Sequence, residues 1–173
     1  MKKNKNGKYP TSESMDQEYI EIVKLLFQYS ISKNVILMMN RRVRSCEKLL
    51  FWSVLHNDIE ITKLVMDYSK KNFFKLNINR KSKNNEHDLF YTAVKNNNDQ
   101  MVMLILDYAK LYNIKLNIND QEKDEKDPLY WAIYHKNYTI AEIIINYVKE
   151  NDINLDMKKR IDGNGDFPLL MAI

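Results

Sequence analysis

The chain repeats itself with a period of 39–40 residues, and this internal repeat constrains its fold more than any other feature. A first segment, Leu-Phe-Trp-Ser-Val in its earliest copy, recurs at offsets of 40, 39 and 40 residues. Its copies are 50–54, 90–94, 129–133 and 169–173. A longer second segment ends in tyrosine each time, and its copies are 22–29, 61–68, 101–108 and 140–147. We therefore expect an array of similar units, each of which contacts only its neighbours.

Each unit is predicted to contain two helices and a long connection. In the second segment, as at 61–68, apolar residues recur at i, i+3, i+4 and i+7 and so share one helix face. The sequence Leu-Asn-Ile-Asn at 76–79 then alternates, which indicates a strand or an extended finger. Asp88 and Asp127 stand where an N-cap would begin the next helix, and Pro128 stands at the first helical position.

The tyrosines that end the second segments occupy one position of the repeat. They are Tyr29, Tyr68, Tyr108 and Tyr147. Because this position lies on the apolar face of the helix, we expect the rings to pack between units rather than to serve as modification or ligand sites.

The repeat also sets the domain boundaries. Residues 1–17 are a polar leader that we expect to be disordered, and residues 18–173 form the repeat domain. The domain divides into a half unit, three full units and a truncated unit, which are 18–49, 50–88, 89–127, 128–167 and 168–173. Since a terminal repeat needs a polar outer face, the apolar segment at 168–173 predicts a fragment, or a segment that docks on another molecule.

Composition excludes several other classes of protein. The 173 residues include three Gly and three Pro, too few for a turn-rich β-sandwich or a collagen-like chain, so asparagine is expected to form most turns. The net charge of +4 is too small for a polyelectrolyte. One cysteine, Cys46, and no secretory or membrane-spanning segment favour a reducing compartment, the cytoplasm or the nucleus, and no membrane partner.

No residues form a recognisable catalytic or metal site, so we expect no enzyme activity, no cofactor and no bound metal. The three histidines lie in different units, and they are His56, His87 and His135. Residues 162–166 begin like a calcium loop, but Phe167 replaces its glycine and Ile173 its glutamate. The basic cluster at 41–44 lies where the first finger should be, and without interleaved aromatic residues it predicts a solvated loop rather than a nucleic-acid site.

The units resemble the ankyrin repeat. Residues 127–132 and 165–172 carry counterparts of its T-P-L-H-x-A core, and 76–79 and 116–119 look like its A-D-V-N segment. The period departs from the family's length of about 33 residues, and asparagine mostly replaces the turn glycine. The resemblance implies an all-α, helical-pair solenoid with extended finger loops.

The resemblance also implies a binding face. In the ankyrin pattern, the residue between the core Leu and Ala and the last positions of the first helix face a concave groove. Carried over position by position, this predicts a partner-binding set of Trp52, His56, Trp131, Tyr134 and His135, with the finger residues Lys83, Glu86, Lys123 and Glu125. Trp and Tyr are the commonest hot-spot residues of interfaces. The alternative is that both tryptophans pack against neighbouring repeats, because the longer unit shifts the register.

These features lead us to expect a non-catalytic scaffold, monomeric, that binds a protein partner through its concave groove and finger loops. Two alternatives remain open. The chain could be the targeting or regulatory module of a larger, even enzymatic, protein that extends beyond residue 173. It could also be a structural spacer with no specific ligand.

Overall fold

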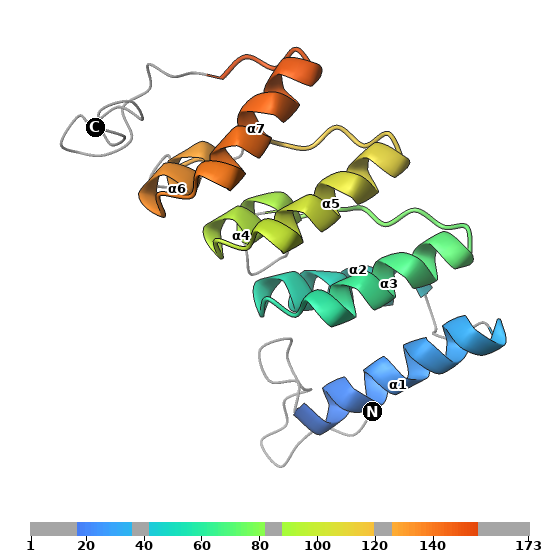
Figure 1. Cartoon of the computed structure of the whole chain (residues 1–173). Coiled ribbons are helices and arrows are strands. Elements are labelled where there is room, and N and C mark those ends of the chain that lie inside the picture. Colours follow the sequence, from blue (N-terminus) through green and yellow to red (C-terminus); the bar gives the residue numbers. More distant parts are fainter. Residues whose placement is uncertain (1–16, 36–41, 82–87, 120–125, 156–173) are drawn as a thin grey trace. The chain divides into compact units, whose positions relative to one another are not determined.

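The computed structural model describes residues 17–35, 42–81, 88–119 and 126–155 (Figure 1). These residues contain seven helices and no strand, so the all-α prediction is confirmed. The helices are α1 (Gln17–Lys33), α2 (Arg42–Leu55), α3 (Ile59–Lys71), α4 (Leu89–Lys95), α5 (Asp99–Leu111), α6 (Pro128–Tyr134) and α7 (Tyr138–Glu150). The chain divides into two compact units, Met1–Leu76 with α1 to α3 and Asn77–Ile173 with α4 to α7.

Short turns join the two helices of each hairpin. In each turn the residue two places before the second helix is left-handed, with φ of 61° at Asn57, 56° at Asn97 and 54° at Lys136. Asparagine tolerates this conformation better than most residues other than glycine. The prediction that asparagine forms the turns of this glycine-poor chain is confirmed at Asn57 and Asn97, while Lys136 takes the third position.

Side-chain caps begin helices α3 to α7. Oδ1 of Asp88 accepts a hydrogen bond of 3.0 Å from the backbone N–H of Tyr91, and Oδ1 of Asp127 accepts one of 2.7 Å from that of Tyr130. Both predicted caps are therefore confirmed, and Pro128 occupies the first turn of α6 as expected. Such caps satisfy backbone donors that the helix itself leaves unpaired.

One prediction is wrong in the first compact unit, Met1–Leu76. Helix α2 begins at Arg42, so the segment 42–49 is helical and not a loop. Cys46 and Leu50, four residues apart, are both fully buried, and this gives the added turns an apolar face of their own. The predicted boundary between residues 49 and 50 therefore falls inside a helix.

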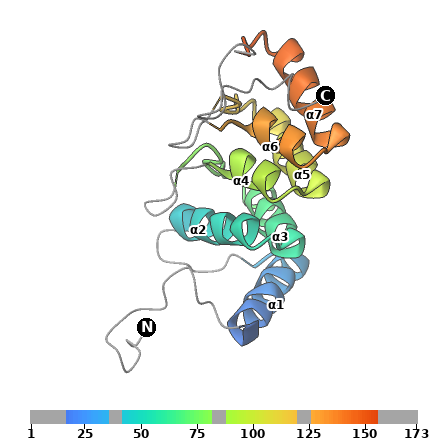
Figure 2. The ribbon, with the colours of Figure 1, turned by 90° about the vertical axis from the view of Figure 1, so that its left-hand side faces the viewer.

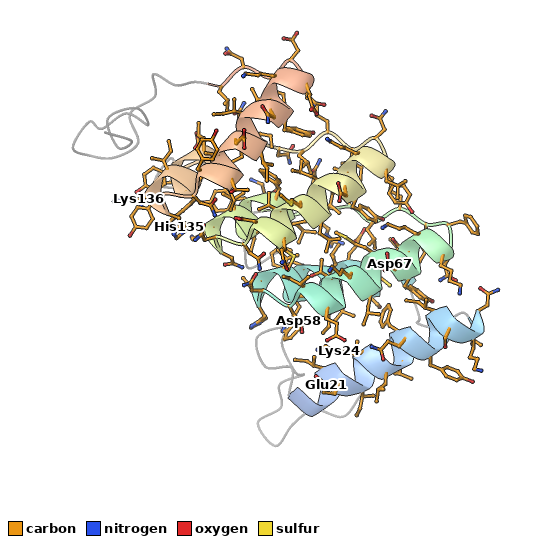
Figure 3. All side chains as sticks on the ribbon, in the orientation of Figure 1. Glu21, Lys24, Asp58, Asp67, His135 and Lys136 are labelled. Carbon is orange, nitrogen blue, oxygen red and sulfur yellow. The ribbon has the colours of Figure 1, made fainter. Side chains whose placement is uncertain are left out.

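Helix α1 is attached to α3 in the first unit by an aromatic contact and by ion pairs. The rings of Phe27 and Tyr68 meet edge to face at 5.0 Å. Nζ of Lys24 lies 2.8 Å from Glu60 and 3.8 Å from Asp58, and Figure 3 shows Lys24 extending from α1 toward Asp58. The hydrogen bond to Glu60 raises the pKa of Lys24 despite the opposing effect of burial.

The alternating Leu-Asn-Ile-Asn segments are irregular connections, and the last two residues of each lie in a turn. Leu116 and Ile118 are buried while Asn117 is exposed, and the described residues form no strand there. Nδ2 of Asn119 donates a 3.2 Å hydrogen bond to the carbonyl of Asn154, one repeat further on. The alternation thus reflects a finger that is tied to the next repeat by an asparagine side chain.

In the second unit, α4 and α6 lie on one side and α5 and α7 on the other (Figure 2). Tyr108 and Tyr147 are buried there, as Tyr68 is in the first unit. The hydroxyl of Tyr147 accepts a 2.9 Å hydrogen bond from the backbone N–H of Leu116 in the preceding repeat. Core packing is therefore confirmed for three of the repeated tyrosines, whereas Tyr29 is exposed.

Candidate functional site

Two hydrogen bonds hold the end of α6 against α4. Nε1 of Trp131 donates to the hydroxyl oxygen of Tyr91 at 2.6 Å. A ring nitrogen of His135, Nε2, lies 3.0 Å from the backbone oxygen of Lys95. Both pairs join residues 40 positions apart in adjacent repeats, so the stacking of these repeats fixes the orientation of both rings.

Four rings then gather at α6, and we call them the α6 aromatic cluster: Tyr130, Trp131, Tyr134 and His135. Trp131 meets Tyr134 edge to face at 5.5 Å and is stacked with His135 at 5.9 Å. Tyr130 and Tyr134 stack at 6.0 Å. Aromatic pairs at these separations and angles are mutually stabilising, so the rings reach the surface already ordered.

Exposure differs across the cluster. Tyr130 is buried, Trp131 and His135 are half-buried, and Tyr134 is 57% exposed. Figure 3 shows His135 and Lys136 where α6 ends and the turn to α7 begins. The cluster thus combines a buried base with an accessible edge, which is the arrangement typical of an interface anchor.

Two lysine side chains lie over these rings. Nζ of Lys95, at the end of α4, lies 4.9 Å from the centre of the Trp131 ring. Nζ of Lys126 lies 5.6 Å from the Trp131 ring and 5.4 Å from the Tyr130 ring. These are cation–π distances, and they place positive charge beside the exposed edge of the cluster.

The first unit contains the other predicted aromatic pair. The rings of Trp52 and His56 lie 4.5 Å apart, and His56 is exposed. Trp52, however, is only 6% exposed, so the expectation that its indole faces a partner is wrong. The large apolar area of an indole favours burial wherever the neighbouring structure leaves room for it.

Only some of the predicted binding residues come together in the part of the chain that the structure describes. It brings Trp131, Tyr134 and His135 together at α6. The finger residues Lys83, Glu86, Lys123 and Glu125 lie outside the described residues.

Three residues of this site were not predicted from the sequence, and they are Tyr91, Lys95 and Lys126. The repeat does not indicate the Tyr91 contact, because the position equivalent to Trp131 in the preceding unit is Thr92. The charged run around Lys126 carries no signal either.

Cys46 is the one cysteine of the chain and is fully buried in α2. Burial, and to a lesser extent the charge of Glu47, raises the pKa of its thiol to about 11. Over the ranges that the structure describes, no three His, Cys, Asp or Glu side chains are grouped closely enough to bind a metal ion. Within the same ranges, no helix has the length and apolar character needed to cross a membrane.

Comparison with known families agrees with the repeat. A family model described as ankyrin repeats in three copies matches residues 50–157. No curated protein and no solved structure matches the chain significantly.

Proposed function

The chain belongs to the ankyrin-repeat family, and we propose that it is a non-catalytic recognition module whose α6 aromatic cluster binds a protein partner. Repeats of this family are generally protein–protein interaction modules and generally non-catalytic. One observation carries the assignment of the surface. Rings held by hydrogen bonds to the preceding repeat present an accessible Tyr134 beside a half-buried Trp131.

The physical argument is preorganisation. Binding costs free energy for every side chain that it immobilises, about 0.5–1.5 kcal/mol for a flexible one. Trp131 and His135 are already fixed from behind by Tyr91 and by the carbonyl of Lys95, so that cost is small for them. Their accessible edges can then contribute apolar contact at little entropic expense.

The lysines give the partner a chemical character. Lys95 and Lys126 place two ammonium groups over the Trp131 ring, so an approaching carboxylate meets positive charge and an aromatic surface together. We propose that the partner presents an acidic segment with an apolar or aromatic residue beside it. Mutation of a rim charge mainly alters the association rate and its salt dependence.

The experiment compares photo-crosslinking from two exposed aromatic positions. A photoreactive phenylalanine replaces Tyr134 in one sample, and it replaces Phe73 of the first unit, which is 94% exposed, in a matched control. We expect a protein that crosslinks from position 134 and not from position 73. We also expect its yield to fall at least tenfold when Trp131→Ala is added and to fall with rising salt.

Equal crosslinking from both positions, or a yield that does not respond to Trp131→Ala, contradicts the proposal. A structural spacer gives no specific crosslink from position 134. Circular dichroism of each variant excludes loss of the fold as the cause.

A further inference from the structure

Helix α1 carries an exposed apolar stripe. Its members follow the i, i+3, i+4, i+7 spacing of one helix face, and they are Ile22 (52% exposed), Leu25 (64%), Leu26 (49%) and Tyr29 (58%). The opposite face of the helix is buried and includes Phe27, which contacts Tyr68 of α3. Contiguous apolar patches left exposed on a folded chain mark interaction sites, so this stripe calls for an explanation.

The repeat shows what such a face does elsewhere in the chain. Tyr29 of α1 is equivalent to Tyr68 of α3, 39 residues later, and Tyr68 is buried against Phe27 of the preceding repeat. The other stripe positions Ile22 and Leu26 correspond to Ile61 and Val65, which are also buried. The Tyr29 position is therefore one at which a second helix packs against the repeat before it.

The complementary surface lies on α7. Carried through the repeat, Phe27 is equivalent to Met66, to Leu106 and finally to Ile145. Met66 and Leu106 are buried, whereas Ile145 is 38% exposed. Inside the first unit, Tyr68 and Phe27 contact each other. Tyr29 occupies the position of Tyr68 and Ile145 occupies the position of Phe27, and both of these side chains are accessible.

We propose that two copies of this chain associate head to tail, with the α1 stripe of one copy against the Ile145 face of α7 in the other. The contact continues an interface that the chain already uses, since α1 packs on α3 in the first unit and α5 packs on α7 in the second. Because the two surfaces differ, the interface is heterologous and leads to open chains or rings rather than to closed two-fold dimers. The proposal departs from the monomer expected from the sequence.

One pair of charges at the proposed contact offers a variant that should associate more strongly than the wild-type chain. Inside the first unit, Lys24 lies 2.8 Å from Glu60 across the stacked helices. At the intermolecular contact the equivalent positions are Glu142 of α7 and Glu21 of α1, two like charges. The variant Glu142→Lys restores the opposite-charge pair, so it should strengthen association.

The test uses analytical ultracentrifugation of the 173-residue chain over a concentration series. We expect the average mass to rise with concentration, and Glu142→Lys to lower the midpoint of that rise several-fold. Leu26→Glu with Tyr29→Glu, or Ile145→Glu alone, should each abolish self-association. Leu111→Glu, a change at a 60% exposed apolar residue outside both faces, is the matched control and should leave it intact.

Mixing the two blocked variants separates this arrangement from others. Each retains the face that the other has lost, so the mixture should form 1:1 dimers and nothing larger. A wild-type chain that stays monomeric up to about 1 mM, the weak end of specific affinities, overturns the proposal. Persistent dimers of Ile145→Glu overturn it as well, because they indicate that α1 pairs with α1.

Discussion

The indole N–H of Trp131 in α6 donates a 2.6 Å hydrogen bond to the hydroxyl of Tyr91 in α4, 40 residues earlier in the chain. Tyr91 is fully buried, so a core residue of one repeat orients a surface residue of the next. Stacking of the repeats thus contributes to stability and to the candidate binding surface through the same bond.

Tyr91→Phe tests that relationship. The variant keeps the buried ring and removes the acceptor, so we expect a loss of about 0.5–1.5 kcal/mol in the free energy of unfolding, the usual net value of one hydrogen bond. Trp131 should gain rotational freedom, which can be followed by the fluorescence anisotropy of a Trp52→Phe background. Unchanged anisotropy would show that packing alone fixes the indole.

The buried hydroxyls of Ser53 and Thr62 lie 2.7 Å apart between α2 and α3. One repeat later the same positions hold Ala93 and Val102, an apolar pair that is equally buried. Either single change, Ser53→Ala or Thr62→Val, removes the hydrogen bond between the two hydroxyls. The remaining hydroxyl keeps a backbone acceptor, which is the carbonyl of Asp58 for Thr62 and that of Leu50 for Ser53, so each change should cost about 0.5–1.5 kcal/mol. The double variant should cost less than the sum of the two, as measured by urea unfolding in a double-mutant cycle. Strict additivity would contradict this coupling.

Phe73 is left-handed, with φ of 55°, and it follows the end of α3. The equivalent residue after α5 is Asn113, with φ of 49°. Left-handed backbone costs a residue with a bulky Cβ about 1–2 kcal/mol, and asparagine relieves part of this cost. We therefore expect Phe73→Asn to raise the free energy of unfolding by roughly 1 kcal/mol and Asn113→Phe to lower it similarly. Thermal or urea unfolding measures both, and a destabilising Phe73→Asn would contradict the prediction.

The thiol of Cys46 should be unreactive in the folded chain. Its pKa of about 11 lies above the ordinary value of 9.0, so folding favours the neutral form. The corresponding stabilisation is complete below pH 9.0 and is lost as the pH rises through about 11. At pH 8 a thiol reagent should label the native chain slowly, and denaturant should speed the labelling by orders of magnitude. Labelling of the native chain at the rate of a free thiol would contradict both burial and the raised pKa.

Local chemistry was readable from the sequence because it acts over a few residues. An aspartate three positions before a backbone donor predicts a cap, and Asp88 and Asp127 form caps. A helix-spaced apolar row predicts a buried face, and Tyr68 is buried on one. The start of α2 was missed because no Gly, Pro or cap marks it, and burial of Cys46 supplies the face that extends the helix.

The candidate site was only partly readable. Trp52 and Trp131 occupy one position of the repeat, yet Trp52 is buried and Trp131 keeps an accessible edge. The period by itself assigns them the same environment. Their difference depends on what each neighbouring segment places against the indole, and the position of Lys126 over the rings depends on the same contacts.

The sequence by itself therefore determined the period, the helical pairs, most of the caps and the asparagine turns, since each rests on interactions within one turn of backbone. The tertiary structure decided which of the side chains at equivalent positions of the repeat are buried by a neighbouring repeat. Coverage depends on stacking between residues about 40 positions apart, and two copies of one pattern can differ in it. Tyr29 and Tyr68 occupy the same position of the repeat, but Tyr68 contacts Phe27 whereas Tyr29 is exposed.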